Sequence, residues 1–349
     1  MTTSSRSDCP LDRPGVLIAA LPAVLGFVPE QSLVLVTVAD GDMGAVLRAD
    51  LDGELRGTLP QLAHLAATSG AEAVIGVLVD DTGASCPMCA DEYRELAHLL
   101  AVELDSRDVE LYAVHVVERV AAGARWHCAD GCGASGVVED PSASPVAAAA
   151  VLDGRRLYAR RSDLVDVVAV ADPAHSAALA EVIVQAGPID PQRPPASARA
   201  DIEHALACAA EVDQGRSLSD ADSARLAWAL TDPRVRDTLY ALAVGDKAGM
   251  AESLWADLSR RLPAPWRVEA LVLLAFSAYA RGDGPLAGIS LDAALSCRPE
   301  HTMAGMLDTA LQSGMRPERI RDLARTGYRL ARQLGVQLPP RRLFGRRAG

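Results

Sequence analysis

Lysine is almost absent from this chain: Lys247 is the only one, and every other basic side chain is an arginine. A phosphate-binding P-loop requires Gly-Lys followed by Ser or Thr, but Lys247 stands between Asp246 and Ala248, so a P-loop is excluded. The His-Glu-x-x-His pattern of zinc proteases and the Gly-x-Ser-x-Gly elbow of serine hydrolases are also missing. These absences favour a non-catalytic protein without excluding other kinds of catalysis.

Long apolar runs and a secretion signal are also missing. The longest apolar stretch, Val16 to Val28, has 13 residues and contains Pro22, whereas a membrane span needs about 20 residues. Residues 1–9 are polar and serine-rich, unlike the charged-then-apolar order of a signal peptide. The formal net charge of −12 repels a phosphate backbone. We therefore expect a cytoplasmic protein that binds neither membranes nor nucleic acid.

The first half of the chain alternates strand-like and helix-like segments. The apolar, β-branched runs at 32–38 and 73–79 are typical of strands buried on both faces. Further strands are expected at 44–50, 109–117 and 124–128, and helices at 16–25, 59–68 and 91–104. Nearly every segment beyond residue 196 has helical period. We predict an α/β fold, with a mixed or mostly parallel sheet and flanking helices, followed by an all-α helical bundle.

A chain of 349 residues is long enough for two domains. Four prolines lie within residues 187–195 and cannot continue a helix or a central strand, so they predict a stiff linker. The predicted organisation is a disordered tail (1–14), an α/β domain (15–187), a linker (188–195), a helical bundle (196–335) and a basic tail (336–349) with Arg341, Arg342, Arg346 and Arg347. The small and apolar residues between Trp266 and Pro299 resemble one degenerate tetratricopeptide helical hairpin.

Four of the seven cysteines form two closely spaced pairs, Cys86-x-x-Cys89 and Cys128-x-x-x-Cys132. Two such pairs can complete a tetrahedral zinc site, and His127 is a substitute ligand. Two other interpretations stay open. The thiols can simply be small buried side chains, or Cys86 and Cys89 can form a redox-active pair, since they follow a predicted strand at the start of a helix.

Arg48 and Asp50 are the other candidate site residues. They lie two apart in the predicted strand 44–50, so their side chains share one face. One interpretation is a local ion pair on a solvated edge strand. The other is a polar ligand-binding pocket at the strand end, with His115 and Trp126 nearby.

Several motifs together resemble the actinobacterial domain-of-unknown-function 4192 family. They are Leu25-Gly26-Phe27-x-Pro29-x-x-Ser32-Leu33-Val34, Arg48-x-Asp50-Leu51, Trp126 with Cys128 and Cys132, Ser144-Pro145-Val146-Ala147, Arg160/Arg161-Ser162-x-Leu164, and Ala275-x-x-Ala278-x-x-x-Gly282-Asp283-Gly284-x-x-Ala287. The resemblance covers most of the chain and implies a cytoplasmic bacterial protein. It also implies that positions 48, 50, 128 and 132 belong to a shared feature, whereas the Cys86/Cys89 pair is less typical of the family.

We therefore expect a non-catalytic regulatory or protein-interaction module that binds a partner through its C-terminal helical domain. Two alternatives stay open. One is a small-molecule binder or enzyme with a polar pocket near Arg48 and Asp50. The other is a structural zinc-binding protein that uses Cys86, Cys89, Cys128 and Cys132.

Overall fold

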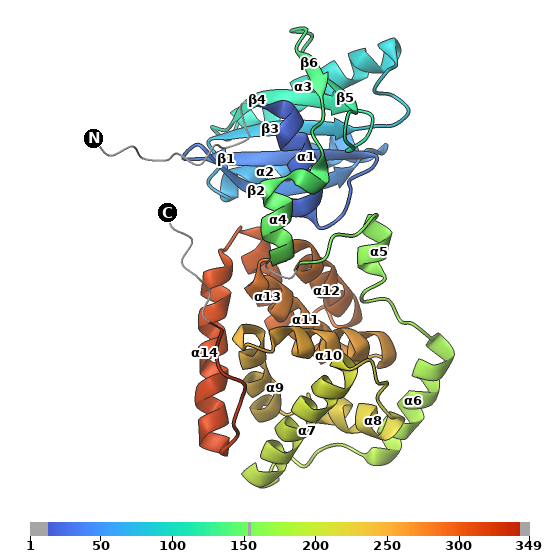
Figure 1. Cartoon of the computed structure of the whole chain (residues 1–349), viewed down its shortest axis with the longest axis vertical. Helices are drawn as coiled ribbons and strands as arrows, with labels where there is room; N and C mark the ends of the chain where they lie inside the picture. The colour runs from blue at the N-terminus through green and yellow to red at the C-terminus, as the bar shows by residue number, and fades with distance from the viewer. Residues whose placement is uncertain (1–12, 153–154, 343–349) are drawn as a thin grey trace, which may run out of the picture. The chain divides into compact units, whose positions relative to one another are not determined.

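The chain forms an α/β unit and a helical unit (Figure 1). The computed structural model describes residues 13–152 and 155–342. The α/β unit comprises residues up to Arg161 together with residues 312–314, and the helical unit comprises the rest. The predicted order, an α/β fold followed by a helical region, is confirmed.

The α/β unit contains one six-stranded sheet with the order β2-β1-β3-β4-β5-β6. Its strands are β1 (Ser32–Ala39), β2 (Asp42–Asp50), β3 (Ala73–Val79), β4 (Glu110–Val117), β5 (Arg125–Cys128) and β6 (Ser135–Val137). Only β3 and β4 are parallel, because a helix connects them, and the other neighbours are antiparallel. The sheet is therefore mixed. Strand β6, which was not among the expected strands, lies in a segment rich in glycine and serine.

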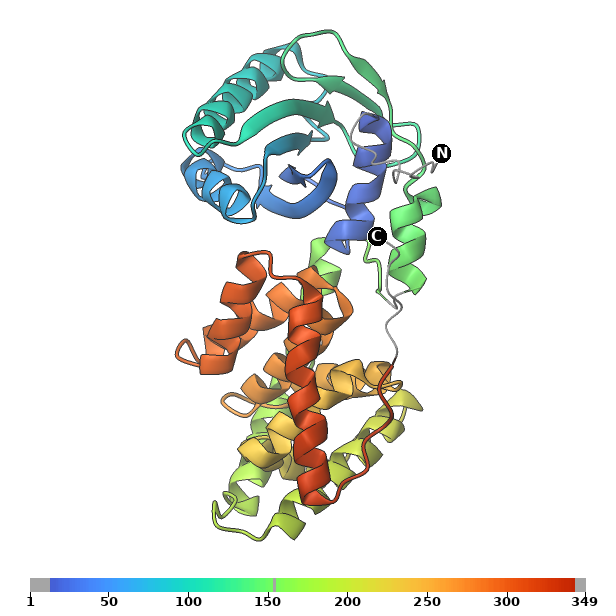
Figure 2. The same cartoon turned by 90° about the vertical axis from the view of Figure 1, so that its left-hand side faces the viewer.

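Helices cover both faces of this sheet. Helices α2 (Leu55–Thr68) and α3 (Pro87–Asp105) lie on one side, and α1 (Pro14–Leu25) lies on the other (Figure 2). Leu33 and Leu35 of β1 pack with α2 and α3, so the alternating Val34 and Val36 face α1. Both sets are almost fully buried, which explains why β1 is a continuous apolar run. The short α4 (Pro145–Leu152) follows the 3₁₀ turn at Pro141–Ala143 and packs beside α1.

The helical unit is built around one central helix. Its elements are α5 (Arg161–Val165), α6 (Pro173–Ala186), α7 (Pro195–Asp213), α8 (Asp220–Ala229), α9 (Pro233–Leu239), the 3₁₀ helix η3 (Tyr240–Val244), α10 (Ala248–Arg261), α11 (Arg267–Arg281), α12 (Gly284–Cys297), α13 (Thr302–Gln312) and α14 (Pro317–Leu334). Every residue from Val268 to Ala280 of α11 is buried, because α10, α12, α14 and η3 all pack against it. No helix in the described parts of the chain has the length and apolar character needed to cross a bilayer.

The proline-rich segment 187–195 lies inside the helical unit and is not the boundary between the two units. Arg193 of this segment donates hydrogen bonds to Asp201 and Asp232, whose side chains are only 9% and 6% exposed. Trp228 Nε1 also donates to the carbonyl of Ile183 at 2.7 Å, which joins α6 to α8. Prolines stop a helix but do not prevent an extended segment from packing. The division at Arg161 therefore differs from the predicted domains 15–187 and 196–335 and from the predicted linker 188–195.

Two other features of the helical unit bear on the predictions. Residues 336–342 of the predicted basic tail run back along α14. The backbone N–H of Arg342 donates to the carbonyl of Val244 in η3 at 2.9 Å. Residues 343–349 and most of the predicted tail 1–14 lie outside the described residues.

Helices α11 and α12 form the expected hairpin, with Ala275, Ala278 and Ala287 fully buried. The likeness of this hairpin to a tetratricopeptide repeat stays a prediction.

Candidate metal centre

His115 of β4 and Cys128 of β5 lie directly opposite each other in the sheet. The next pair along the two strands is joined by a hydrogen bond from Ala129 N to the carbonyl of Val114. The His115/Cys128 pair is therefore a non-hydrogen-bonded pair, in which side chains lie closest, with Cβ atoms about 4.5–5.5 Å apart. His115 is opposite Val77, which is opposite Val34, so this pair lies on the α1 face of the sheet.

The loop that follows Cys128 brings two further ligand types beside it. Gly131 and Gly133 adopt positive φ angles of 77° and 82°, which glycine tolerates at little cost, and these turns fold the loop tightly. The backbone N–H of Cys132 donates to Asp130 Oδ1 at 2.8 Å. As a result Cys128 Sγ, Cys132 Sγ and a carboxylate oxygen of Asp130 all lie within 4.8 Å of one another.

His115 is not one of these three mutually close ligands, but it lies opposite Cys128 in the sheet and has an unsatisfied polar atom. Its side chain is 6% exposed, and its Nδ1 is buried without a hydrogen-bond partner. Trp126 packs edge-on against the ring, with centroids 5.0 Å apart. Burial lowers the pKa of His115, and the nearby Asp130 carboxylate opposes this shift only in part. The ring is therefore neutral at pH 7, which is the form that binds metals.

The pKa values of Cys128 and Asp130 are shifted in opposite directions. Burial and a hydrogen bond to Asp130 raise the pKa of Cys128 to about 12. Hydrogen bonds from the Cys132 N–H and thiol hold the pKa of Asp130 below its ordinary value. The buried Cys128 thiol thus keeps its proton at pH 7 and donates it in a hydrogen bond to the Asp130 carboxylate. A metal ion can replace that proton, because thiolates bind zinc strongly.

The distances are compatible with zinc. Ligands held about 2.3 Å from a tetrahedral zinc ion lie about 3.8 Å from one another, and the three ligand atoms are already within 4.8 Å. Small side-chain rotations would close the remaining distance. Two thiolates, one carboxylate and one imidazole are all ligand types that zinc accepts. Zinc is therefore the metal that fits this donor set.

The structure does not bring the four predicted metal-binding cysteines together. Cys86 is the N-cap residue of α3, and Cys89 packs against the core between the sheet and helices α2 and α3, whereas Cys128 lies on the α1 face. His127, the suggested substitute ligand, is opposite Val116 of that same core. It therefore lies on the face opposite to Cys128, because strand side chains alternate.

Cys86 and Cys89 interact mainly with each other. Hydrogen bonds from the backbone N–H and side chain of Cys89 lower the pKa of Cys86. The pKa of Cys89 is raised, chiefly by its hydrogen bond with Cys86. A low pKa on the first cysteine at a helix N-terminus is the polarity of a redox-active pair. Both are free thiols.

The four predicted ligand-binding residues share one face of the sheet but form two separate pairs. Arg48 is opposite Val34, so two strands separate it from His115, a distance of about 14 Å at ~4.8 Å per strand. Arg48 donates to Ser32 Oγ at 2.8 Å and to Asp50 Oδ1 at 2.5 Å. Its guanidinium also lies over the ring of Phe27. Arg48 and Asp50 thus join β2 to the segment before β1, while His115 and Trp126 belong to the metal centre.

Sequence reasoning missed Asp130 and a second trio. Asp130 could have been found because an acidic residue between two cysteines adds a third ligand to the same loop. The second trio is His204, Cys208 and Asp222, whose ligand atoms also lie within 4.8 Å of one another. The spacing of His204 and Cys208 puts them on one face of α7, but nothing local places Asp222 of α8 beside them.

The fold and this site define a class: an α/β unit with a candidate metal-binding loop at the edge of a mixed sheet, followed by a helical unit. A family model described as Domain of unknown function (DUF4192) matches residues 14–318, so the chain belongs to this family. A search of curated proteins found no match, and neither did a search of solved structures.

Proposed function

We propose that this protein is a non-catalytic, zinc-binding interaction protein. Zinc would bind Cys128, Asp130 and Cys132, with His115 as the fourth ligand. The observation that carries the proposal is the convergence of three ligand atoms within 4.8 Å beside a buried imidazole nitrogen that has no hydrogen-bond partner. Buried polar atoms are rarely left unpaired in folded proteins, and a bound metal would account for this one.

A structural role suits the donor set and the local fold. Four protein ligands fill a tetrahedral shell, whereas catalytic zinc sites keep one position for water. Strands β5 and β6 have only four and three residues, and β6 ends the sheet. Short edge strands contribute little stability on their own. Zinc would hold the loop between β5 and β6 to β4 and so stabilise this edge.

Elemental analysis of the purified full-length chain tests the zinc proposal. We expect about one zinc per chain, as for a structural site. Cys132→Ser removes one ligand from an exposed position, so it should lower the content below ~0.1 zinc per chain without unfolding the protein. Cys297→Ser is the matched control, because Cys297 is also an exposed free thiol and should retain the metal.

A further variant separates the two trios. Cys208→Ser disables the trio in the helical unit and should leave the zinc content unchanged. Wild-type protein with less than ~0.1 zinc per chain, or equal losses in Cys132→Ser and Cys297→Ser, would contradict the proposal. Loss of zinc in Cys208→Ser alone would move the metal site to α7 and α8 and would equally contradict it.

The interaction role is proposed for the helical unit. Its support is three large apolar side chains that are left exposed, Met306 on α13, Met315, and Leu323 on α14. Exposed apolar side chains of this size are candidates for a protein-binding surface, because burying them in a complex is favourable. Affinity purification from native cells should recover a stoichiometric partner with the wild-type chain.

The partner should be lost with a Met306→Glu/Leu323→Glu variant, because two charges would have to be buried at the interface. Val184→Glu is the matched control, since Val184 is an exposed apolar residue on α6, away from α13 and α14 in the sequence. A partner that survives the double substitution would rule out this surface, and the absence of any stoichiometric partner would remove the interaction role.

A further inference from the structure

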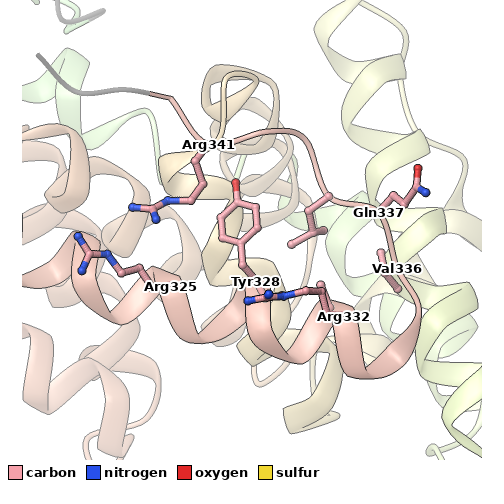
Figure 3. A pocket seen from close by; sticks show the side chains of 8 residues that line it. Arg325, Tyr328, Arg332, Val336, Gln337 and Arg341 are labelled. Carbon is pink, nitrogen blue, oxygen red and sulfur yellow. The ribbon is translucent and has the colours of Figure 1, made fainter.

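A cationic cavity lies between α14 and the segment that follows it (Figure 3). Its volume is about 570 Å³, within the range typical of small-molecule sites, roughly 300–1,000 Å³. The lining residues are Arg325, Tyr328, Ala331, Arg332, Val336, Gln337, Leu338 and Arg341. All of them lie beyond residue 318, where the family match ends.

The backbone holds this cavity open in a defined shape. Gly335 adopts a left-handed conformation with φ 72° and ends α14, so the chain reverses and runs back along the helix. Tyr328 Oη donates to the carbonyl of Pro339 at 2.9 Å. Arg341 pairs with Gly245 in an isolated β-bridge. These contacts fix the returning segment at both of its ends, so the cavity is largely pre-formed.

Three guanidinium groups line the cavity. Arg325, Tyr328 and Arg332 follow the i, i+3, i+7 spacing that puts side chains on one face of a helix, and Arg341 comes from the returning segment. In Figure 3 the Arg325 and Arg341 side chains extend to the same side of the Tyr328 ring. The cavity is therefore cationic, although the chain as a whole has a net charge of −12.

These charges are only partly neutralised. Arg325 forms an ion pair with Asp322 at 3.0 Å, and both side chains are exposed. Asp246 is a further acidic residue beside the returning segment, where its backbone N–H donates to the carbonyl of Pro340 at 2.9 Å. Within the part of the chain that the structure describes, Arg332 and Arg341 form no ion pair with a carboxylate. Two guanidinium groups thus remain available to an anion.

We propose that this cavity binds a small molecule that carries phosphate groups. Guanidinium forks match phosphate oxygens in a bidentate geometry, and two or three of them can hold adjacent phosphates. The ring of Tyr328 and the aliphatic Val336 and Leu338 offer apolar contacts to the rest of such a ligand. Nucleic acid is a poorer candidate, because the acidic surface would repel a long polyanion.

Isothermal titration of the full-length chain with inorganic tripolyphosphate and with ATP, at low salt, tests this proposal. Wild-type protein should bind at least one of the two probes at a single site, more weakly as salt is raised. Equal affinities for the two probes would mean that only the phosphates contact the cavity. Tighter binding of ATP would mean that the nucleoside also contacts it, and weaker binding of ATP would indicate that the ligand is a free polyphosphate. Each of these three results supports the proposal that the cavity binds phosphate groups.

Charge-matched variants decide whether the cavity is responsible. Arg332→Gln and Arg341→Gln should each raise the Kd about tenfold, or ~1.4 kcal/mol. Both residues are exposed, so neither substitution should unfold the protein. Arg329→Gln removes the same charge from the same helix but does not line the cavity and should change the Kd less than about twofold. The absence of binding by both probes, or equal losses in all three variants, would overturn the proposal.

Discussion

Tyr93 donates a hydrogen bond of 2.6 Å to the buried carboxylate of Asp80, and Tyr93→Phe should measurably destabilise the α/β unit. The substitution removes one hydroxyl and leaves the packing of the ring unchanged. Asp80 keeps its hydrogen bonds from Thr82 and Gly83, so only one contact is lost. A hydrogen bond to a charged group contributes about 1.5–3 kcal/mol. We therefore expect the free energy of unfolding of this unit to fall by about 2 kcal/mol.

The same carboxylate predicts a pH dependence with a definite sign. Burial acts to raise the pKa of Asp80, but hydrogen bonds from Tyr93, Gly83 and Thr82 outweigh it and hold the pKa well below its ordinary value. The stability that this group contributes is therefore complete above the unfolded pKa of about 3.9 and falls as the pH drops further. Below pH ~4 the wild type should lose up to about 1.4 kcal/mol per pH unit more than Asp80→Asn.

Urea unfolding followed by pulsed amide hydrogen exchange measures both effects. Peptides from β3 and α3 report on the α/β unit separately from the helical unit. Tyr112→Phe is the control, because this tyrosine on β4 is 61% exposed and its loss should cost less than about 0.5 kcal/mol. Equal losses in Tyr93→Phe and Tyr112→Phe, or equal acid slopes in wild type and Asp80→Asn, would refute the reasoning.

Three further substitutions test the packing. Gly136→Ala should destabilise the α/β unit by about 1–3 kcal/mol, because its Cβ would lie 2.9 Å from Nε1 of the buried Trp126; hydrogen exchange of the β5 peptide measures this. Gly57→Ala should instead stabilise the same unit by about 0.5 kcal/mol, since no atom lies within 4 Å of the added Cβ, and a loss of stability would contradict this. Arg193→Ala removes the partner that two buried aspartates share, although Asp201 keeps Arg225 and Asp232 keeps Arg234. It should therefore cost the helical unit about 1.5–3 kcal/mol, measured by urea unfolding. A loss under about 1 kcal/mol would show that the network contributes little.

Elements with a strong local pattern were predictable, and those defined by their neighbours were not. The apolar run of β1 and the amphipathic spacing of α3 identify a strand and a helix from the sequence alone. Strand β6 has three residues and pairs only with β5, so no periodicity reveals it. The prolines of 187–195 carry a real local signal, the end of α6, but Arg193 packs this segment against helices that come later in the chain.

The same distinction applies to the candidate site. The sequence by itself determined that an α/β fold precedes a helical region, that common catalytic motifs are missing, and that Cys128 and Cys132 can reach one ion, because these properties depend on residue type and short spacing. Only the tertiary structure decided that His115 faces Cys128, that Cys86 and Cys89 lie elsewhere, and that two strands separate Arg48 from His115. Strand order and cross-strand register bring together residues that are far apart in the chain, and these pairings cannot be predicted from local composition.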